Sequence, residues 1–411
     1  MSENMEELKR RVREAVSGRL DLTRSVGDDE IRETIAQVVA EESRKRYLTL
    51  AEKREVMEGV FNAMRGLDVL QPLVDDPSIT EIMINGPEHV FVEQNGRLFR
   101  KNVSFESNEK LENVILTIVS KVNRTVNEAN PIVDARLLNG SRVNVVLPPI
   151  ALDGPTVTIR KFPEDPMTME RLIGYGSITP QVAEVLERMV RAKYNIFISG
   201  GTGSGKTTFL NALSNYIPKD ERVITIEDSA ELQIEGVENL VRLETRNANM
   251  EGKGEVTIRD LIRSSLRMRP ERIVVGEVRG AEALDMLQAM NTGHDGPLST
   301  GHSNSTRDML SRLETMVISG NQIPIEAIRQ QIASALDIII QLSRLRDKSR
   351  RTLEITEVVG YEDGKIILNP LYRFVERGED KNGRIIGGLE RTEHPMVNLY
   401  KFHMAGLPDQ V

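Results

Sequence analysis

Residues 200–208 are Gly200-Gly201-Thr202-Gly203-Ser204-Gly205-Lys206-Thr207-Thr208, and they follow the apolar run Ile196-Phe197-Ile198. The first eight match G-x-x-x-x-G-K-[ST], and a strand before them with a helix after them is the context of a nucleotide-binding P-loop. We predict that helix over about 207–216. Glycines let backbone N–H groups point at phosphate oxygens, and the helix dipole adds its positive end. Lys206 is expected to hold the β- and γ-phosphates and Thr207 a magnesium ion. A glycine-rich turn without a ligand is the alternative.

The composition is that of a globular protein with more than one domain. A chain of 411 residues suits two or three domains, and 39% of its residues are apolar. It has no cysteine, which excludes disulfides and zinc sites built on thiolates and fits a reducing cytosol.

No segment of the sequence predicts export or membrane insertion. The first residues lack a basic region followed by an apolar core, and no apolar run approaches the ~18 residues that a membrane span requires. A net charge of −8 argues against a dedicated nucleic-acid binder, although a local basic groove is left open. We therefore expect a cytoplasmic protein without a stable nucleic-acid partner.

The first two segments of the chain differ in texture. Residues 1–65 are dense in Glu, Lys and Arg, which predicts a small helical N-terminal appendage, the alternative being a partly disordered solvated arm. Residues 66–162 alternate strand-like runs with a helical pattern over 111–122, and Asn95-Gly96 between two such runs indicates a hairpin. This second segment is predicted to be an α+β domain.

A linker over 163–177 is predicted from Pro163 and Pro166, which stop the preceding strand and stiffen the chain. Residues 178–411 form the predicted P-loop domain. Apolar runs there predict strands separated by helices, at 196–198, 223–226, 273–275, 298–300 and 338–340. Buried strands of this kind indicate an α/β fold with a mainly parallel sheet covered on both faces. Alternating runs around Glu362-Asp363-Gly364-Lys365 predict an added hairpin.

Acidic residues follow two of the predicted strands, at the edge where ligands bind in an open parallel sheet. Glu227, Asp228 and Glu231 come after the strand 223–226, with a solvated loop as the alternative. The strand 273–275 ends in Gly276-Glu277, and a carboxylate there can hold magnesium through water or polarise the attacking water of an NTPase. A surface glutamate is the alternative for Glu277.

Chain order indicates the kind of nucleotide site. A strand between the P-loop and Glu277 resembles the RecA-like branch of P-loop ATPases more than the kinase and GTPase branch. The sequence also lacks the Asn/Thr-Lys-x-Asp tetrapeptide that recognises guanine. ATP is therefore the expected nucleotide.

Two histidines, His294 and His302, lie eight residues apart among small polar residues. The remaining histidines are not at ligand spacing, so no metal site is expected from them. The favoured interpretation is a sensor loop in which an imidazole donates to the γ-phosphate or to a neighbouring carboxylate. A structural histidine is the alternative for either one.

Arginines recur every four residues at Arg259, Arg263 and Arg267, on a predicted helix whose other face is apolar. A solvated basic face is the default interpretation. The alternative is that some of them face a neighbouring subunit or its nucleotide, since arginine suits bidentate phosphate contacts.

These segments together resemble the secretion ATPase superfamily of bacterial type II and type IV systems. Its landmarks are a P-loop, an Asp box, a Walker B motif ending in Gly-Glu and a His box, which correspond to 200–208, 225–231, 274–277 and 292–302. The sequence is most similar to the CpaF/TadA branch that powers tight-adherence (Tad) pili, through 243–246, 267–270 and 276–296. The segments 142–144 and 158–162 carry the same resemblance in the N-terminal domain.

Two segments depart from that branch. Asn247-Ala248-Asn249 stands where a proline-containing run is usual, and Gly301 replaces the isoleucine of Ser-Thr-Ile-His-Ala-Asn in the loop that presents His302. Absence of cysteine also separates the chain from extension ATPases that carry a tetracysteine zinc module.

The resemblance implies a role for each site residue. Glu231 would lie nearest the attacking water, with Glu227 and Asp228 in support, and Glu277 would bind magnesium or orient water. Arg142 or Arg160 would complete the γ-phosphate site when the domains close. Catalysis would consist of positioning and charge neutralisation during in-line attack by water.

Partners and function are implied in the same way. The resemblance implies a homohexameric ring that uses ATP and Mg²⁺ and docks on inner-membrane pilus platform proteins, at the inner face of the cell membrane. The expected function is a motor that assembles a Tad pilus, with retraction left open. A conjugation-type secretion ATPase that moves protein or DNA is the first alternative. A nucleic-acid motor such as a helicase and a non-catalytic nucleotide-gated scaffold are the others.

Overall fold

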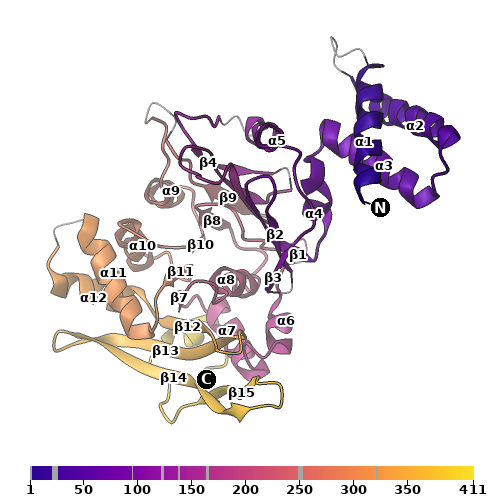
Figure 1. Ribbon diagram of the computed structural model, residues 1–411. Coiled ribbons are helices and arrows are strands. Elements are labelled where there is room, and N and C mark those ends of the chain that lie inside the picture. Colours follow the sequence, from indigo (N-terminus) through magenta and orange to yellow (C-terminus); the bar gives the residue numbers. More distant parts are fainter. Residues whose placement is uncertain are drawn as a thin grey trace. The chain divides into compact units, whose positions relative to one another are not determined.

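Two units make up the chain, Met1–Glu164 and Asp165–Val411, drawn in indigo to purple and in magenta to yellow in Figure 1. The computed structural model describes residues 2–20, 26–94, 96–121, 125–137, 139–162, 166–248, 253–320 and 323–411. Each unit has its own buried apolar clusters. The residues of the predicted N-terminal appendage and α+β domain fall together in the first unit.

Helices form the first part of the first unit, namely α1 (Ser2–Ser17), α2 (Asp28–Lys45) and α3 (Leu50–Arg65). A reciprocal capping box starts α3, because the Thr49 hydroxyl accepts from the Glu52 backbone N–H and the Glu52 carboxylate accepts from Thr49. One apolar cluster, which includes Val12, Ile35 and Val56, joins the helices. Sparse apolar positions in 1–65 therefore suffice for a small packed bundle.

A six-stranded sheet follows, in the order β3-β2-β1-β6-β5-β4 and antiparallel throughout. Its strands are β1 (Ile79–Asn85), β2 (Val90–Gln94), β3 (Arg97–Arg100), β4 (Ile132–Arg136), β5 (Arg142–Val146) and β6 (Thr156–Arg160). The helical elements beside it are η1 (Asp68–Leu70), α4 (Gln71–Asp75) and α5 (Asn108–Ser120).

The predicted hairpin is present between β2 and β3, where Gln94 pairs with Arg97. Gly96 there has a φ of 71°, the left-handed conformation that favours glycine, whereas Asn95 lies outside the described residues. Val122, at the end of the helical pattern that corresponds to α5, also lies outside them. Strand β4 was not predicted.

The segment predicted as a linker contains a helix of the second unit. Residues 163–165, including Pro163, lie outside the described residues, and α6 (Met169–Gly174) follows. Met169 and Leu172 are buried in a core cluster of the second unit. Burial of these two side chains explains why the segment folds with that unit.

The second unit is built on a nine-stranded sheet in the order β15-β14-β13-β12-β7-β11-β10-β8-β9. Its strands are β7 (Ile196–Gly200), β8 (Val223–Glu227), β9 (Leu240–Glu244), β10 (Arg272–Val275), β11 (Leu298–His302), β12 (Ile338–Arg344), β13 (Arg350–Glu362), β14 (Lys365–Glu379) and β15 (Ile385–Arg391). Its other helices are α7 (Pro180–Arg191), α8 (Lys206–Ser214), α9 (Ile258–Ser265), α10 (Glu282–Asn291), α11 (Thr306–Gly320), α12 (Ile325–Ala335) and α13 (Tyr400–Ala405).

The predicted fold class is confirmed by this sheet. All the predicted strands are present as β7, β8, β10, β11 and β12. Neighbours among them pair in parallel, and β9 adds a further parallel strand beside β8. The predicted hairpin joins β13 to β14, with Glu362 opposite Lys365. Strands β9 and β15, at the two edges of the sheet, were not predicted.

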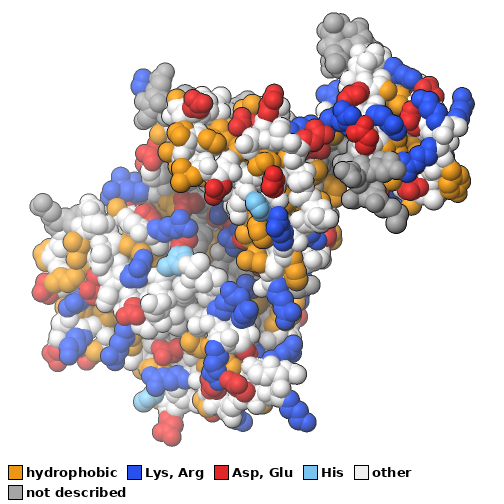
Figure 2. Space-filling view, in the orientation of Figure 1, with side chains coloured by type: hydrophobic (Ala, Val, Ile, Leu, Met, Phe, Trp, Pro, Cys, Tyr) orange, Lys and Arg blue, Asp and Glu red, His pale blue; other side chains and the backbone are white. Residues whose placement is uncertain are grey.

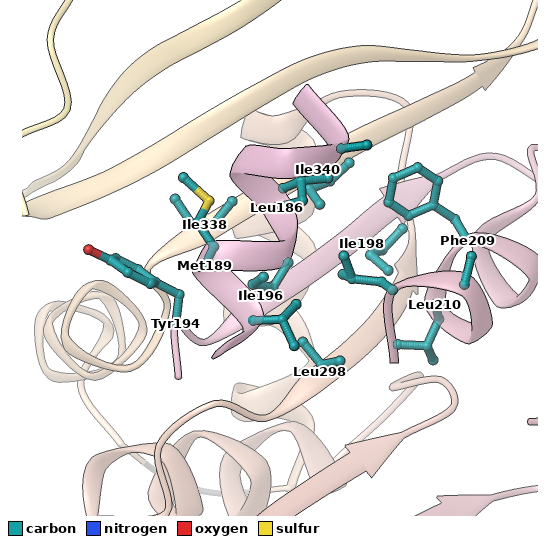
Figure 3. Close-up of a cluster of buried hydrophobic side chains, with 14 of the residues drawn as sticks. Leu186, Met189, Tyr194, Ile196, Ile198, Phe209, Leu210, Leu298, Ile338 and Ile340 are labelled. Atoms are coloured by element: carbon teal, nitrogen blue, oxygen red, sulfur yellow. The ribbon is translucent and has the colours of Figure 1, made fainter. Parts of the chain in front are cut away.

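Helices cover both faces of the parallel part. Side chains alternate along β7, so that Ile196 and Ile198 pack with α7 and α8 while Phe197 packs with α10 and α11. Figure 3 shows the first of these clusters, with Leu186 of α7 and Phe209 of α8 directed at the strands. The continuous apolar runs of the sequence are thus explained by burial on both sides.

The surface carries a mixture of charges. Basic and acidic side chains are interspersed over the face shown in Figure 2, as expected for a chain with 54 Lys and Arg and 62 Asp and Glu. Among the residues that the structure describes, none of the helices combines the length and the apolar character that crossing a bilayer requires.

Replacing Leu186 tests the packing of the cluster in Figure 3. This side chain is fully buried, so Leu186→Ala should lower the free energy of unfolding of the second unit by about 2–5 kcal/mol. Met404 on α13 is 70% exposed, and Met404→Ala should change it by less than about 0.5 kcal/mol. Denaturant titrations of both variants give the comparison, and equal losses would contradict this description of the core.

Candidate active site

The P-loop connects the end of β7 to the start of α8 at Lys206. Gly203 and Gly205 have φ angles of 72° and 93°, which side-chain-bearing residues rarely adopt. A Cβ atom at Gly200 would collide with the Ser204 hydroxyl and lie 2.8 Å from the Leu342 carbonyl oxygen. The loop therefore requires glycine at these positions, and α8 begins directly after it with its N–H groups toward the loop.

Lys206 is buried at the base of this loop. Its side chain donates to the Gly201 carbonyl oxygen at 3.0 Å, and its Nζ lies 3.3 Å from His302 Nδ1. Burial lowers the pKa of Lys206, and the nearby Glu277 carboxylate opposes that shift. The predicted phosphate-binding lysine thus lies among groups that accept hydrogen bonds.

His302 links Lys206 to Glu277, because its Nε2 lies 2.9 Å from a Glu277 carboxylate oxygen. Burial, followed by the charge of Lys206, lowers the pKa of His302, so its ring is neutral near pH 7. An ammonium group has no acceptor, so Nδ1 must face Lys206 without a proton, and Nε2 carries the proton on the side of Glu277. The Nε2 contact is close but is not aligned as a hydrogen bond, because that Glu277 oxygen is buried without a hydrogen-bond partner among the described residues. His302 thus lies beside a carboxylate, and the predicted donation to a carboxylate or to the γ-phosphate stays a prediction.

Arg279 occupies the other side of Glu277. Its Nη2 donates to the second carboxylate oxygen at 2.6 Å, and its Nη1 lies 3.5 Å from Asp228. Arg279 was not among the predicted site residues. A signal was present, because Arg279 is two positions after Glu277 just past the end of β10, and alternate residues of an extended chain share a side.

Glu227, the last residue of β8, is the most buried carboxylate at this edge, with 3% exposure. One oxygen accepts the backbone N–H groups of Glu231 and Leu232 at 2.9 and 3.0 Å, which fixes the start of the acidic loop. Within the described residues its second oxygen is buried without a hydrogen-bond partner. Burial raises the pKa of Glu227 to about 7.

Strand register explains why these groups meet. In the parallel pairs of β7, Gly200 lies beside His302 of β11 and Leu342 of β12. The carboxyl ends of β8 and β10 lie at the same edge, which brings Glu227 and Glu277 to the P-loop. Most of the predicted site residues of the second unit are therefore together.

The structure does not bring His294 to the P-loop, contrary to the prediction. His294 precedes β11 and His302 ends it, so the two lie at opposite edges of the sheet. The neighbouring Asp295 accepts a hydrogen bond from Lys401 at 2.9 Å near the amino ends of the strands. The His box is one segment of sequence, but a buried strand runs through it.

Arg142 and Arg160 belong to the first unit. They lie directly opposite each other on β5 and β6, and Arg160 is 3.8 Å from Glu81. Residues paired in this way present their side chains on the same face of a sheet. A part for them in the P-loop site remains a proposal.

Two arginines of the predicted basic helix are paired within the chain. Arg259 and Arg263 on α9 each donate to a carboxylate oxygen of the buried Asp285 on α10, both at 2.7 Å. These ion pairs hold α9 against α10. The Arg263 side chain is 54% exposed, so it is solvated as well as paired, whereas Arg259 is half-buried. A contact with another subunit is not required to explain either of them.

Replacing Glu227 tests its buried, protonated state. The folded chain holds this proton up to about pH 7, whereas the free carboxyl loses it near 4.5, so the free energy of unfolding should fall as pH rises between those values. The loss should be on the order of 2–3 kcal/mol. Glu227→Gln should remove this dependence and make the variant more stable than the wild type at pH 8.

Denaturant titrations from pH 5 to 8 measure the effect, with Glu238→Gln as an exposed control on the same segment. A slope that persists in Glu227→Gln would contradict the assignment.

Known proteins share much of this sequence. The sequence matches the family described as type II/IV secretion system protein over residues 63–376. It is 35% identical over 309 residues to a putative conjugal transfer protein of Mycobacterium tuberculosis, covering 74% of this chain and 87% of that protein. It is 34% identical over 303 residues to the type IV secretion system protein VirB11 of Brucella suis, covering 67% and 84%.

A solved structure of the pilus retraction motor PilT with bound ADP has the same fold, with a TM-score of 0.53 at 20% identity over 83% of this chain and 87% of that one. The family match includes the sheet of the first unit and, in the second unit, strands β7 to β13 and most of β14. This chain belongs to the type II/IV secretion system protein family.

Proposed function

We propose that the chain is an ATP-hydrolysing, homohexameric motor that powers assembly of a Tad-type pilus from the cytoplasmic face of the inner membrane. The observation that carries the proposal is the row of contacts from Lys206 in the P-loop through His302 to Glu277. A glycine loop, a buried lysine and converging carboxylates at one sheet edge suit binding and hydrolysis of a nucleoside triphosphate.

The nucleotide would occupy 200–208, with Lys206 on the β- and γ-phosphates. Thr207 and Glu277 supply a hydroxyl and a carboxylate, the hard oxygen donors that fit a magnesium ion, and neither is fully buried. When bound, that ion supplies charge neutralisation at the phosphates. His302 would report the state of the γ-phosphate to Glu277.

Hydrolysis requires a group that orients water and accepts its proton. The attacking oxygen forms one bond to the γ-phosphorus while the bond to the β-phosphate oxygen breaks. We assign the water to Glu231, with Asp228 and Glu227 as supports, because Glu227 fixes the backbone of the loop that carries them. The ion pair between Arg279 and Asp228 would hold that loop near Glu277.

Residues from outside the second unit would complete the site. Arg142 and Arg160 are presented on one face of the first unit, and we propose that they reach the γ-phosphate when the units close. A ring with heterologous interfaces would repeat this arrangement at each subunit. Platform proteins of the inner membrane would be its partners.

Secretion of protein or DNA by a conjugation-type system is the second candidate. Its support is specific, since the relatives described above include a conjugal transfer protein and a type IV secretion protein. The fold shared with PilT is compatible with both candidates.

Purified protein tests the chemistry. Lys206→Ala and Glu277→Gln should each lower ATP turnover by about a hundredfold or more, because each removes charge stabilisation at the phosphates. Glu362→Gln, at an exposed hairpin turn, should turn over ATP like the wild type. A wild-type chain that stays monomeric by light scattering and has no turnover would overturn the proposal.

The same variants in cells separate the two candidates. Loss of pili with Glu277→Gln, but not with Glu362→Gln, is the result expected for a pilus motor. Intact pili with lost conjugal transfer would favour the second candidate instead.

A further inference from the structure

A second cationic side chain, in addition to Lys206, contacts the P-loop, and it comes from strand β13. Arg350 is the first residue of β13, and its Nε donates to the Gly203 carbonyl oxygen at 2.9 Å. The same side chain approaches Gly205, where an added Cβ would lie 3.4 Å from Arg350 Cδ. Residues 203 and 350 are 147 positions apart, so only the folded sheet brings them together.

The remaining N–H groups of Arg350 are available for a ligand. Arginine has five donors, of which Nε is the one engaged with Gly203. Across the described ranges, no carboxylate forms an ion pair with Arg350, and its side chain is exposed. The contact therefore positions a guanidinium group at the P-loop with its two terminal nitrogens unengaged.

Arg344 strengthens the positive charge at this place. It ends β12 and pairs directly with Arg350 in the antiparallel register of β12 and β13. Side chains paired in this way lie on the same face of the sheet, and like charges placed so repel each other. Arg344 likewise lacks an ion pair in the part of the chain that the structure describes. An anion between these groups would relieve the repulsion.

The neighbouring arginines Arg346 and Arg351 differ, because their guanidinium groups have partners within the chain. Arg346 in the adjoining turn pairs with Glu376 and Glu379, and Arg351 donates to the Tyr175 carbonyl oxygen at 2.7 Å. The cationic pair is thus confined to 344 and 350, which lie just beyond the register position where Leu342 is beside Gly200.

The backbone of Arg350 is fixed. The Ser177 hydroxyl donates to the Arg350 carbonyl oxygen at 2.8 Å, and the Thr352 N–H donates to the Ser177 carbonyl oxygen at 3.0 Å. A cation held in place before the ligand arrives loses little conformational freedom on binding, which favours affinity.

We propose that Arg350, supported by Arg344, binds the phosphate chain of the nucleotide in the P-loop of its own subunit. This inference rests on the proposed nucleotide site and adds to Lys206 a cation from β13. Arginine is suited to the task, because its planar fork binds phosphate oxygens through two parallel hydrogen bonds.

Equilibrium binding of ATP and ADP to the purified full-length chain tests the proposal. Arg350→Ala should weaken ATP binding roughly tenfold or more, the effect of losing a charge-assisted contact to phosphate. Arg350→Lys keeps the charge but lacks the planar fork, so its loss of affinity should be smaller than that of Arg350→Ala. Arg351→Gln is the matched control, since the adjacent arginine contacts Tyr175 and not the P-loop, and it should leave affinity unchanged.

Three outcomes would overturn the proposal. Unchanged affinity in Arg350→Ala would show that the side chain does not contact the nucleotide. Equal losses in Arg350→Ala and Arg350→Lys, with lowered thermal stability, would show that it only supports the loop. A loss of ATP affinity in Arg351→Gln as large as in Arg350→Ala would show that the effect comes from the contacts between the start of β13 and residues 175–177. Lys206→Ala in the same assay tests the nucleotide site itself, because normal binding there would refute the proposed function instead.

Discussion

Parallel pairing of β7 with β11 and β12 is the constraint on which the rest of the site depends. Parallel strands end at the same edge, and the register that sets Gly200 beside His302 and Leu342 leaves no freedom in where the P-loop begins. Alternate side chains of β7 are buried against helices on opposite faces of the sheet. These contacts hold the register, because a shift by one residue would move every side chain of the strand to the other face. The core therefore positions the chemistry.

The two edges of the sheet differ in how their polar groups are satisfied. At the amino edge the fully buried Arg272 donates to Glu221 and to the carbonyl oxygens of Val190 and Gly296, so its charge is matched. At the carboxyl edge one oxygen of Glu227, one oxygen of Glu277 and the Ser204 hydroxyl are buried without hydrogen-bond partners among the described residues. Unmatched polar atoms are costly in a stable core, and their presence around a phosphate-binding loop is typical of a binding site.

The charged groups of this edge engage one another. Lys206 is held by Gly201 and His302, and Glu277 is held by His302 and Arg279. A phosphate that enters the loop must replace some of these contacts, which links nucleotide binding to the positions of the acidic loop and of β11. A ligand that binds one arrangement of these groups better than another shifts the chain toward that arrangement.

Local patterns in the sequence predicted much of this arrangement. The P-loop glycines, the Glu362–Lys365 hairpin and the apolar strands each carry their structure within a few residues, and all of them are present. Edge strands β9 and β15 escaped prediction because half-exposed strands lack a continuous apolar run. His294 was misplaced because a motif was treated as one loop although β11 divides it. Arg350 could not be found, since its neighbour is far away in sequence and only register brings the two together.

A structure of the chain with magnesium and a non-hydrolysable ATP analogue is the most direct test of the central claim. We expect phosphates in the loop of 200–208, with Lys206 Nζ transferred from the Gly201 carbonyl oxygen to the β- and γ-phosphate oxygens. His302 should remain within hydrogen-bonding distance of Glu277. An empty loop at saturating analogue, or Lys206 still bonded to Gly201 with the analogue bound elsewhere, would contradict it.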